Sequence, residues 1–207
     1  MSFQIQSGEF VAIVGRSGSG KTTLLDLLGL LLRPTGGTIL IDGVDTGTLG
    51  EGERATMRGE RIGFIFQEFN LLSTLTAVEN VMLPLRYRRR KDPAGRARAL
   101  RLLDEVDLSD RVEHRPAELS GGQAQRVAIA RSLINDPALV LGDEPTGEVD
   151  SETSMQLLDL MRRINSERGV TFVIVTHDLE VAGRADRIIR LKDGRVASDE
   201  PAKATSV

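Results

Sequence analysis

The chain has 207 residues and a net charge of −3, and 40% of its side chains are hydrophobic while only 3% are aromatic. This length predicts one domain with a sizeable core, and neither the charge nor the aromatic content is typical of a nucleic-acid-binding surface. The absence of cysteine excludes disulfides, cysteine-ligated zinc and thiol catalysis, and no apolar stretch approaches the ~20 residues that span a bilayer, so we expect a soluble, cytosolic protein without a nucleic-acid partner.

Strands and helices alternate in the first part of the chain. The continuous apolar run at residues 10–14 predicts a strand buried on both faces, and a helical pattern follows from residue 21 to about residue 32. Short strands bounded by turn residues are predicted at residues 38–41 and 62–66.

The strand pattern then gives way to helical periods at residues 77–90, 94–106 and 121–135. It returns at residues 138–141, 170–175 and 187–191, with a long helical pattern at residues 151–167. This alternation predicts an α/β fold with a mostly parallel sheet flanked by helices. We expect a single domain with a core at residues 1–67 and 136–198, an inserted helical subdomain at about residues 68–135, and a frayed polar tail at residues 199–207.

A glycine-rich loop follows the first predicted strand and opens the first predicted helix. Residues 15–22 match the pattern G-x-x-x-x-G-K-[ST] of nucleotide-binding P-loops. Glycines let backbone N–H groups approach phosphate oxygens, and the helix N-terminus adds partial positive charge. Lys21 is expected to reach the β- and γ-phosphates, and the Thr22 hydroxyl to bind Mg²⁺. The predicted phosphate-binding residues are Gly15, Arg16, Ser17, Gly18, Ser19, Gly20, Lys21, Thr22 and Thr23.

Two carboxylates follow the apolar run at residues 138–142. Ligands of open parallel sheets bind at the carboxyl ends of the strands, where Asp143 and Glu144 are expected to lie. Asp143 would bind Mg²⁺ and Glu144 would act as the general base that polarises the attacking water. Taken alone, an Asp-Glu pair after a strand is commonly a loop or a helix cap, and its pairing with the glycine-rich loop favours function.

A second anion site is predicted at the start of another helix. Ser120 is a candidate N-cap, and Gly121 and Gly122 expose backbone N–H groups there. An ordinary capped helix does not explain two adjacent glycines, which are unfavourable in helices. The run Leu119-Ser-Gly-Gly-Gln123 closely resembles the signature sequence of ATP-binding-cassette (ABC) ATPases.

Other motifs resemble those of the same family, in the same order. Gln67 follows a predicted strand, as the Q-loop glutamine does; Gly147-Glu-Val-Asp150 resembles the D-loop; and His177 matches the switch histidine. Alone, each has an ordinary structural explanation, such as a helix cap for Asp150. The resemblance covers residues 8–196 and is strongest to the lipoprotein-release and macrolide-export branch.

The resemblance implies an ATPase with ATP and Mg²⁺ as cofactors, working as a head-to-tail homodimer. Ser120, Gly121, Gly122, Gln123 and Asp150 would contact the ATP held by the partner's glycine-rich loop. The implied catalytic residues are Glu144, His177 and Gln67, and the implied metal ligands are Thr22, Gln67 and Asp143. A separate integral membrane permease, whose cytoplasmic helices fit near residues 67–85, would hold the protein on the inner face of the membrane and use hydrolysis for export or extraction.

The start of the chain departs from the family pattern. Only fourteen residues precede Gly15, whereas family members generally have further strands there, with an aromatic residue that stacks on adenine. Tyr87, the only tyrosine, is a poor substitute. Our hypothesis is a truncated gene model, with Met1 at an alternative start codon inside a longer frame, and the alternative is a genuinely short cassette with impaired nucleotide binding. A soluble cassette of DNA repair or translation is the alternative to a transporter subunit. The basic residues between 86 and 101 are interpreted as a solvated helix face.

Overall fold

The computed structural model describes residues 1–88 and 92–202, and its centre is a six-stranded sheet in the order β4–β5–β6–β1–β7–β8. Neighbouring strands are parallel except for the antiparallel pair β7–β8. The strands are β1 (Phe10–Val14), β4 (Ile62–Ile65), β5 (Leu139–Asp143), β6 (Thr171–Thr176), β7 (Arg187–Lys192) and β8 (Arg195–Pro201). The predicted mostly parallel sheet is therefore present.

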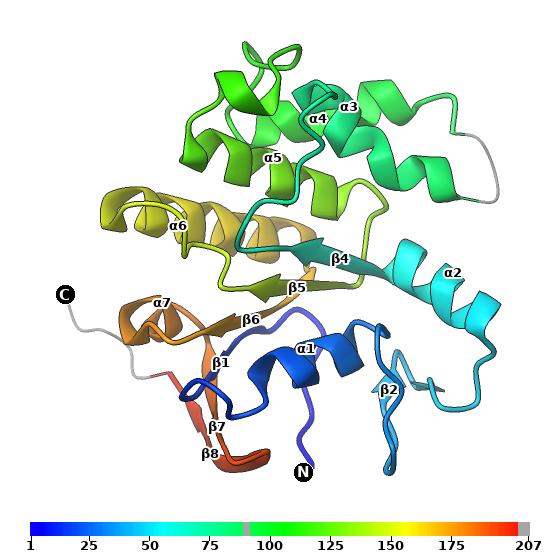
Figure 1. The fold of residues 1–207 in the computed structure, drawn as a ribbon, viewed down its shortest axis with the longest axis vertical. Coiled ribbons are helices and arrows are strands. Elements are labelled where there is room, and N and C mark those ends of the chain that lie inside the picture. The colour runs from blue at the N-terminus through cyan, green and yellow to red at the C-terminus, as the bar shows by residue number, and fades with distance from the viewer. Residues whose placement is uncertain (89–91, 203–207) are drawn as a thin grey trace.

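The sheet is covered on both faces, as the buried strand β1 requires (Figure 1). Alternate residues of a strand point to opposite faces, so Val11 and Ile13 pack in a cluster with Leu24 and Leu25 of α1 (Lys21–Leu28). The remaining residues of β1 pack in a second cluster with α6 (Ser151–Arg168). The helices α1 and α6 thus lie on opposite faces of the sheet.

A helical region is inserted between β4 and β5 and lies at the top of Figure 1. It contains α3 (Ala77–Met82), the 3₁₀ helix η1 (Leu83–Tyr87), α4 (Gly95–Glu105), the 3₁₀ helix η2 (Pro116–Glu118) and α5 (Gly121–Leu133). The helices α3, α4 and α5 contact one another, and α5 also packs on β4 and α6. Helix α5 therefore joins the helical region to the sheet.

Some elements have no counterpart in the sequence pattern. They are β3 (Val44–Asp45), α2 (Glu51–Arg61) and α7 (Leu179–Gly183), whereas β2 (Leu40–Ile41), which pairs with β3 in a hairpin, lies within the strand predicted at residues 38–41. Helix α2 has no apolar stripe: its one fully buried side chain is Arg54, which donates to the carbonyl oxygens of Leu30 at 3.1 Å and Leu32 at 2.8 Å. Helix α2 is thus held by hydrogen bonds from Arg54 to the loop after α1. Such contacts leave no periodic apolar pattern in the sequence.

Two predicted helices end early. Helix α1 stops at Leu28 rather than near residue 32, because Leu30 takes a positive φ of 57°. The helix expected at residues 77–90 changes from α to 3₁₀ after Met82, where Pro84 has no N–H to continue the α-helical bonds. The end of that prediction, residues 89–90, lies outside the described residues.

The prediction of a frayed tail from residue 199 is wrong for its first residues. Strand β8 pairs with β7 as far as Pro201, and the Arg187 guanidinium makes two hydrogen bonds to the Asp199 carboxylate, the Nη2–Oδ2 distance being 2.7 Å. The Ala202 N–H donates to the Asp186 carbonyl at 2.9 Å. Strand pairing offsets the polar composition here, and residues 203–207 lie outside the described part of the chain.

Candidate functional site

The predicted phosphate-binding residues 15–23 form the turn after β1 and the first turn of α1. Gly18 and Gly20 adopt φ values of 76° and 96°, which glycine accepts without strain. A Cβ atom on Gly15 would lie 2.6 Å from the carbonyl oxygen of Leu191. Lys21 Nζ donates to the carbonyl oxygens of Gly15 at 2.8 Å and Arg16 at 3.2 Å. The loop is thus a tight cradle with an ammonium group folded over it.

The parallel register brings three chain segments to the same sheet edge. Val14 at the end of β1 pairs with Thr176 at the end of β6, and Asp143 at the end of β5 pairs with Val175 of β6. The glycine-rich loop, the Asp143–Glu144 pair and His177 follow directly. The register thus puts Asp143 at the carboxyl ends of the strands, as predicted, and puts the glycine-rich loop and His177 at the same edge.

The carboxylates at this edge differ in environment. The pKa of Asp143 is raised, first by burial and then by the negative charges of Glu144 and Asp26, while the charge of Lys21 opposes the rise. Glu144 has a positive φ of 44°, and its Oε1 lies 2.7 Å from His177 Nδ1. That hydrogen bond raises the pKa of His177, whose side chain is otherwise 77% exposed. This edge of the sheet therefore holds Asp143, a carboxylate with a raised pKa, and the hydrogen-bonded carboxylate–imidazole pair of Glu144 and His177.

Gln67 and Asp150 bind to their own chain. Gln67 Nε2 donates to Glu148 Oε1 at 2.8 Å, linking the loop after β4 to the loop after β5. Asp150 caps α6, accepting from the Thr153 N–H at 2.9 Å and from the Thr153 hydroxyl at 2.7 Å. These bonds lower the pKa of Asp150. Within a single copy of the chain, Asp150 therefore acts as a helix cap, which is its ordinary structural explanation.

The residues of the signature sequence begin α5 through a reciprocal cap. The Gln123 N–H donates to Ser120 Oγ at 3.2 Å, and the Ser120 N–H donates to Gln123 Oε1 at 2.9 Å. A Cβ on Gly122 would lie 2.6 Å from Thr153 Cγ2, whereas one on Gly121 would meet nothing closer than 3.5 Å. Close packing between the starts of α5 and α6 thus explains Gly122 but not Gly121.

Comparison with known proteins identifies the family. The family model described as ABC transporter matches residues 1–147. This chain belongs to the ABC transporter family. The resemblance inferred from the motifs and the α/β fold with its inserted helical subdomain are confirmed, and the chain is an ABC ATPase domain.

Relatives of this ABC ATPase domain fall into two groups by length. It is 49% identical over 213 residues to the macrolide export ATP-binding/permease protein MacB of Rhodopirellula baltica, covering all of this chain and 31% of that protein. It is 52% identical over 194 residues to the lipoprotein-releasing system ATP-binding protein LolD 1 of Rhodopseudomonas palustris, covering 93% of this chain and 86% of that one. The chain therefore spans less than a third of the curated MacB relatives it matches, at 28–31% of their length.

A solved structure shares both sequence and fold with this ABC ATPase domain. The dimeric post-hydrolysis state of the ATP-binding cassette MJ0796, bound to ADP and Pi, is 46% identical with a TM-score of 0.86, over 97% of this chain and 88% of that one. MJ0796 is an ABC transporter ATP-binding protein of Methanocaldococcus jannaschii.

Two residues at the site have no role in the sequence prediction. Gln125 of α5 is fully buried, and its Nε2 donates to the carbonyl oxygens of Phe66 at 3.4 Å and of Pro145. Arg131, on the same helix, donates to the carbonyl oxygen of Phe69 at 2.7 Å, and burial lowers its pKa to about 10. The available signal was that both polar residues interrupt an otherwise apolar face of α5.

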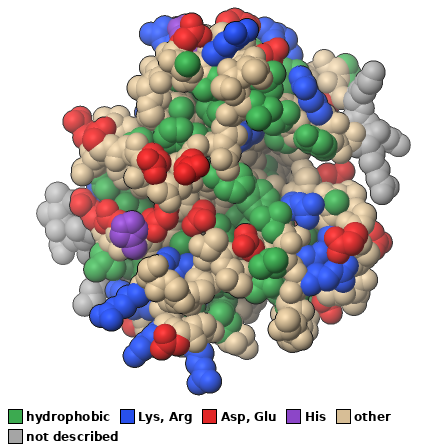
Figure 2. All heavy atoms as spheres, in the orientation of Figure 1, with side chains coloured by type: hydrophobic (Ala, Val, Ile, Leu, Met, Phe, Trp, Pro, Cys, Tyr) green, Lys and Arg blue, Asp and Glu red, His purple; other side chains and the backbone are tan. Residues whose placement is uncertain are grey.

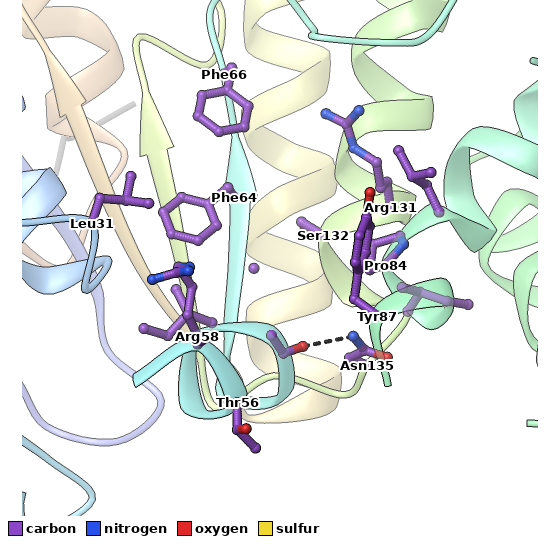
Figure 3. Close-up of a pocket in the computed structure, with 16 residues that line it drawn as sticks. Leu31, Thr56, Arg58, Phe64, Phe66, Pro84, Tyr87, Arg131, Ser132 and Asn135 are labelled. Atoms are coloured by element: carbon purple, nitrogen blue, oxygen red, sulfur yellow. Dashed lines mark hydrogen bonds between the residues drawn. The ribbon is translucent and has the colours of Figure 1, made fainter. Parts of the chain in front are cut away.

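A cleft of about 690 Å³ separates the helical region from the sheet. Phe64 of β4 and Phe66, just after that strand, stack with ring centroids 5.8 Å apart, and Figure 3 shows Arg58 below Phe64 and Arg131 of α5 to the right of both rings. Hydrophobic side chains gather in the middle of the face seen in Figure 2. Tyr87 lines this cleft and is 83% exposed.

In the part of the chain that the structure describes, no helix has the length and apolarity to cross a bilayer.

Proposed function

We propose that this ABC ATPase domain binds ATP and Mg²⁺ at the carboxyl edge of its sheet and that the hydrolysis of ATP drives a membrane permease. One observation carries the proposal: the glycine-rich loop, the Asp143–Glu144 pair and His177 follow neighbouring strands whose register ends at one edge. These groups suit phosphate binding, metal binding and the activation of water.

The glycine-rich loop fits the phosphates of ATP. Its glycines leave backbone N–H groups accessible, and the N-terminus of α1 adds partial positive charge to the same place. Lys21 Nζ, which bonds to loop carbonyl oxygens, would donate to the β- and γ-phosphates instead. We assign phosphate binding to residues 15–23.

Thr22, Asp143 and Gln67 would hold Mg²⁺. Their hydroxyl, carboxylate and amide oxygens are the hard donors that this cation prefers. Burial, and after it the negative charges of Glu144 and Asp26, raises the pKa of Asp143, and a bound cation would favour its charged form. No cluster of three His, Cys, Asp or Glu side chains suited to a metal occurs within residues 1–88 and 92–202, so we assign the remaining ligands to phosphate oxygens and water. Bound Mg²⁺ would neutralise charge developing on the phosphoryl group.

Glu144 would take the proton of the attacking water. Its hydrogen bond to His177 at 2.7 Å supports this role, because a base must be held in a fixed orientation. His177, largely exposed at the same edge, would hold the γ-phosphate. Gln67 would align the water after leaving Glu148.

We further infer a head-to-tail homodimer in which Ser120, Gly121, Gly122, Gln123 and Asp150 complete the partner's ATP site. The glycine-rich loop begins α1 and the signature sequence begins α5, and these helices belong to clusters on opposite faces of the sheet. A second copy would bring the two anion-binding helix starts together around one nucleotide. The dimeric state of MJ0796 supports this arrangement.

The cleft between α2, β4, η1 and α5 would receive a cytoplasmic helix of the permease. Its stacked phenylalanines and exposed Tyr87 offer an apolar surface, and the names of MacB and LolD indicate an export or extraction system. The domain would lie on the cytoplasmic face of the membrane. We infer that the domain divides into a core of residues 1–67 and 136–198 and a helical subdomain of about residues 68–135, and this cleft would then lie at the boundary between them.

Two assays test the proposal. The purified chain should release phosphate from ATP with Mg²⁺ and not with excess EDTA. Tyr87→Asp should weaken co-purification with the permease, whereas Leu40→Asp, at a similarly exposed leucine outside the cleft, should not. Absence of phosphate release would refute the reaction, and equal behaviour of the two variants would refute docking in the cleft.

A further inference from the structure

We propose that Gln125 is a positioning residue for hydrolysis, which fixes the loops carrying Gln67 and Glu144 relative to the start of α5. The proposal rests on the proposed function, because it concerns how the assigned groups are held. Gln125 itself would touch neither ATP nor the attacking water.

The hydrogen bonds of Gln125 reach both loops at once. Its side chain has no exposed area, and its Nε2 donates to the carbonyl oxygens of Phe66 and Pro145. Phe66 directly precedes Gln67, and Pro145 directly follows Glu144. The Phe66 carbonyl also accepts from the Phe69 N–H at 3.3 Å, so separating either loop from α5 would cost mainly a hydrogen bond of the buried Gln125 amide.

The sheet itself does not hold these two carbonyl groups. The pairing of β4 with β5 ends at Ile65 and Gly142, so Phe66 and Pro145 lie beyond the last paired residues. Outside the sheet, side chains connect the two loops: Gln125 from the buried side, and the exposed bond from Gln67 to Glu148. The buried link is the one that would persist when Gln67 moves toward nucleotide.

The same residue connects these loops to the signature sequence. Gln125 lies one helical turn after Gly121, whose backbone N–H is assigned to the partner's ATP. A helix moves as a rigid element, so a displacement of its start would reach the Phe66 and Pro145 carbonyl groups through one side chain. Gln125 would thereby couple the binding of the partner's ATP at Gly121 to the positions of Gln67 and Glu144 beside the chain's own ATP.

Replacement of Gln125 by methionine tests the role without creating a cavity. Gln125 Oε1 has no hydrogen-bond partner in the described residues, so methionine removes that buried unpaired oxygen along with the donor. Gln125→Met should retain ATP affinity, because the glycine-rich loop is untouched, but lower kcat about tenfold to a hundredfold through misplacement of reacting groups. Gln125→Glu, which replaces the donor by an oxygen, should be at least as slow.

Ile129→Val is the matched control, since Ile129 is equally buried on α5 and its side chain cannot form a hydrogen bond; the kcat of this variant should equal that of the parent chain. Each kcat is expressed per ATP-binding site, so that unfolded protein does not contribute, and Gln125→Glu serves if Gln125→Met does not fold. A parent-like kcat in either variant, or a loss of affinity that parallels the loss of kcat, would overturn the proposal. Absence of hydrolysis by the parent chain would instead refute the proposed function.

Discussion

Replacement of Glu144 by glutamine should separate ATP binding from ATP hydrolysis. Glu144 is only 17% exposed, and its Oε1 lies 2.7 Å from His177 Nδ1. Glutamine has the same size and can bond to either tautomer of the imidazole, so the edge of the sheet should keep its geometry. The variant loses only a carboxylate that can accept a proton.

The expected loss follows from the role of a general base. Positioned bases contribute about 10²- to 10⁴-fold, so the barrier should rise by roughly 3–5 kcal/mol while the dissociation constant for ATP stays unchanged. Phosphate release under saturating ATP measures the first quantity, and equilibrium binding of a fluorescent ATP analogue measures the second. Turnover at the parent rate would refute the assignment of Glu144, and lost ATP binding would show that Glu144 is structural.

Three further predictions concern the groups around this base. Lys21→Ala should weaken ATP binding about tenfold to a hundredfold, since charge-assisted hydrogen bonds to phosphate are lost; an unchanged dissociation constant in calorimetry would contradict the role. Gly15→Ala should lower the free energy of unfolding by about 1–3 kcal/mol, because the new Cβ would lie 2.6 Å from the Leu191 carbonyl oxygen, whereas Gly36→Ala, with no atom within 4 Å of its Cβ, should be neutral in urea denaturation. The bond to Glu144 raises the pKa of His177 above its usual 6.5, so this bond stabilises the fold fully below pH 6.5 and ceases to do so as the pH rises through the raised value. Because the imidazole is largely exposed, that effect should not exceed about 1 kcal/mol, and unfolding of His177→Gln at several pH values should lack it.

Local chemistry made much of the site predictable. The glycine-rich loop and the paired carboxylates each follow an apolar strand directly. The glycines that a tight turn needs and the carboxylates at the strand end are therefore close in sequence to the strands that position them. The strand order also brings these segments together, as alternation of strands and helices implies. The family resemblance added Gln67, Asp150 and His177, which have ordinary roles when taken singly.

Contacts between distant segments were not predictable in this way. Helix α2 is held by the buried Arg54 and its bonds to loop carbonyl oxygens, and β8 is a strand because it pairs with β7. Gln125 bonds to residues 59 and 20 positions away in the sequence, so only the folded chain reveals its contacts. The sequence pattern marks such residues only as polar interruptions of an apolar face.

The molar mass of Glu144→Gln in solution tests the head-to-tail dimer most directly. Light scattering on the eluting protein should give the mass of the 22.5 kDa chain without nucleotide and twice that mass with Mg²⁺ and ATP. The same variant carrying Lys21→Ala should stay at the lower mass, because it lacks the nucleotide that joins the two copies. A monomer mass for Glu144→Gln at saturating ATP, with and without the permease, would contradict the account.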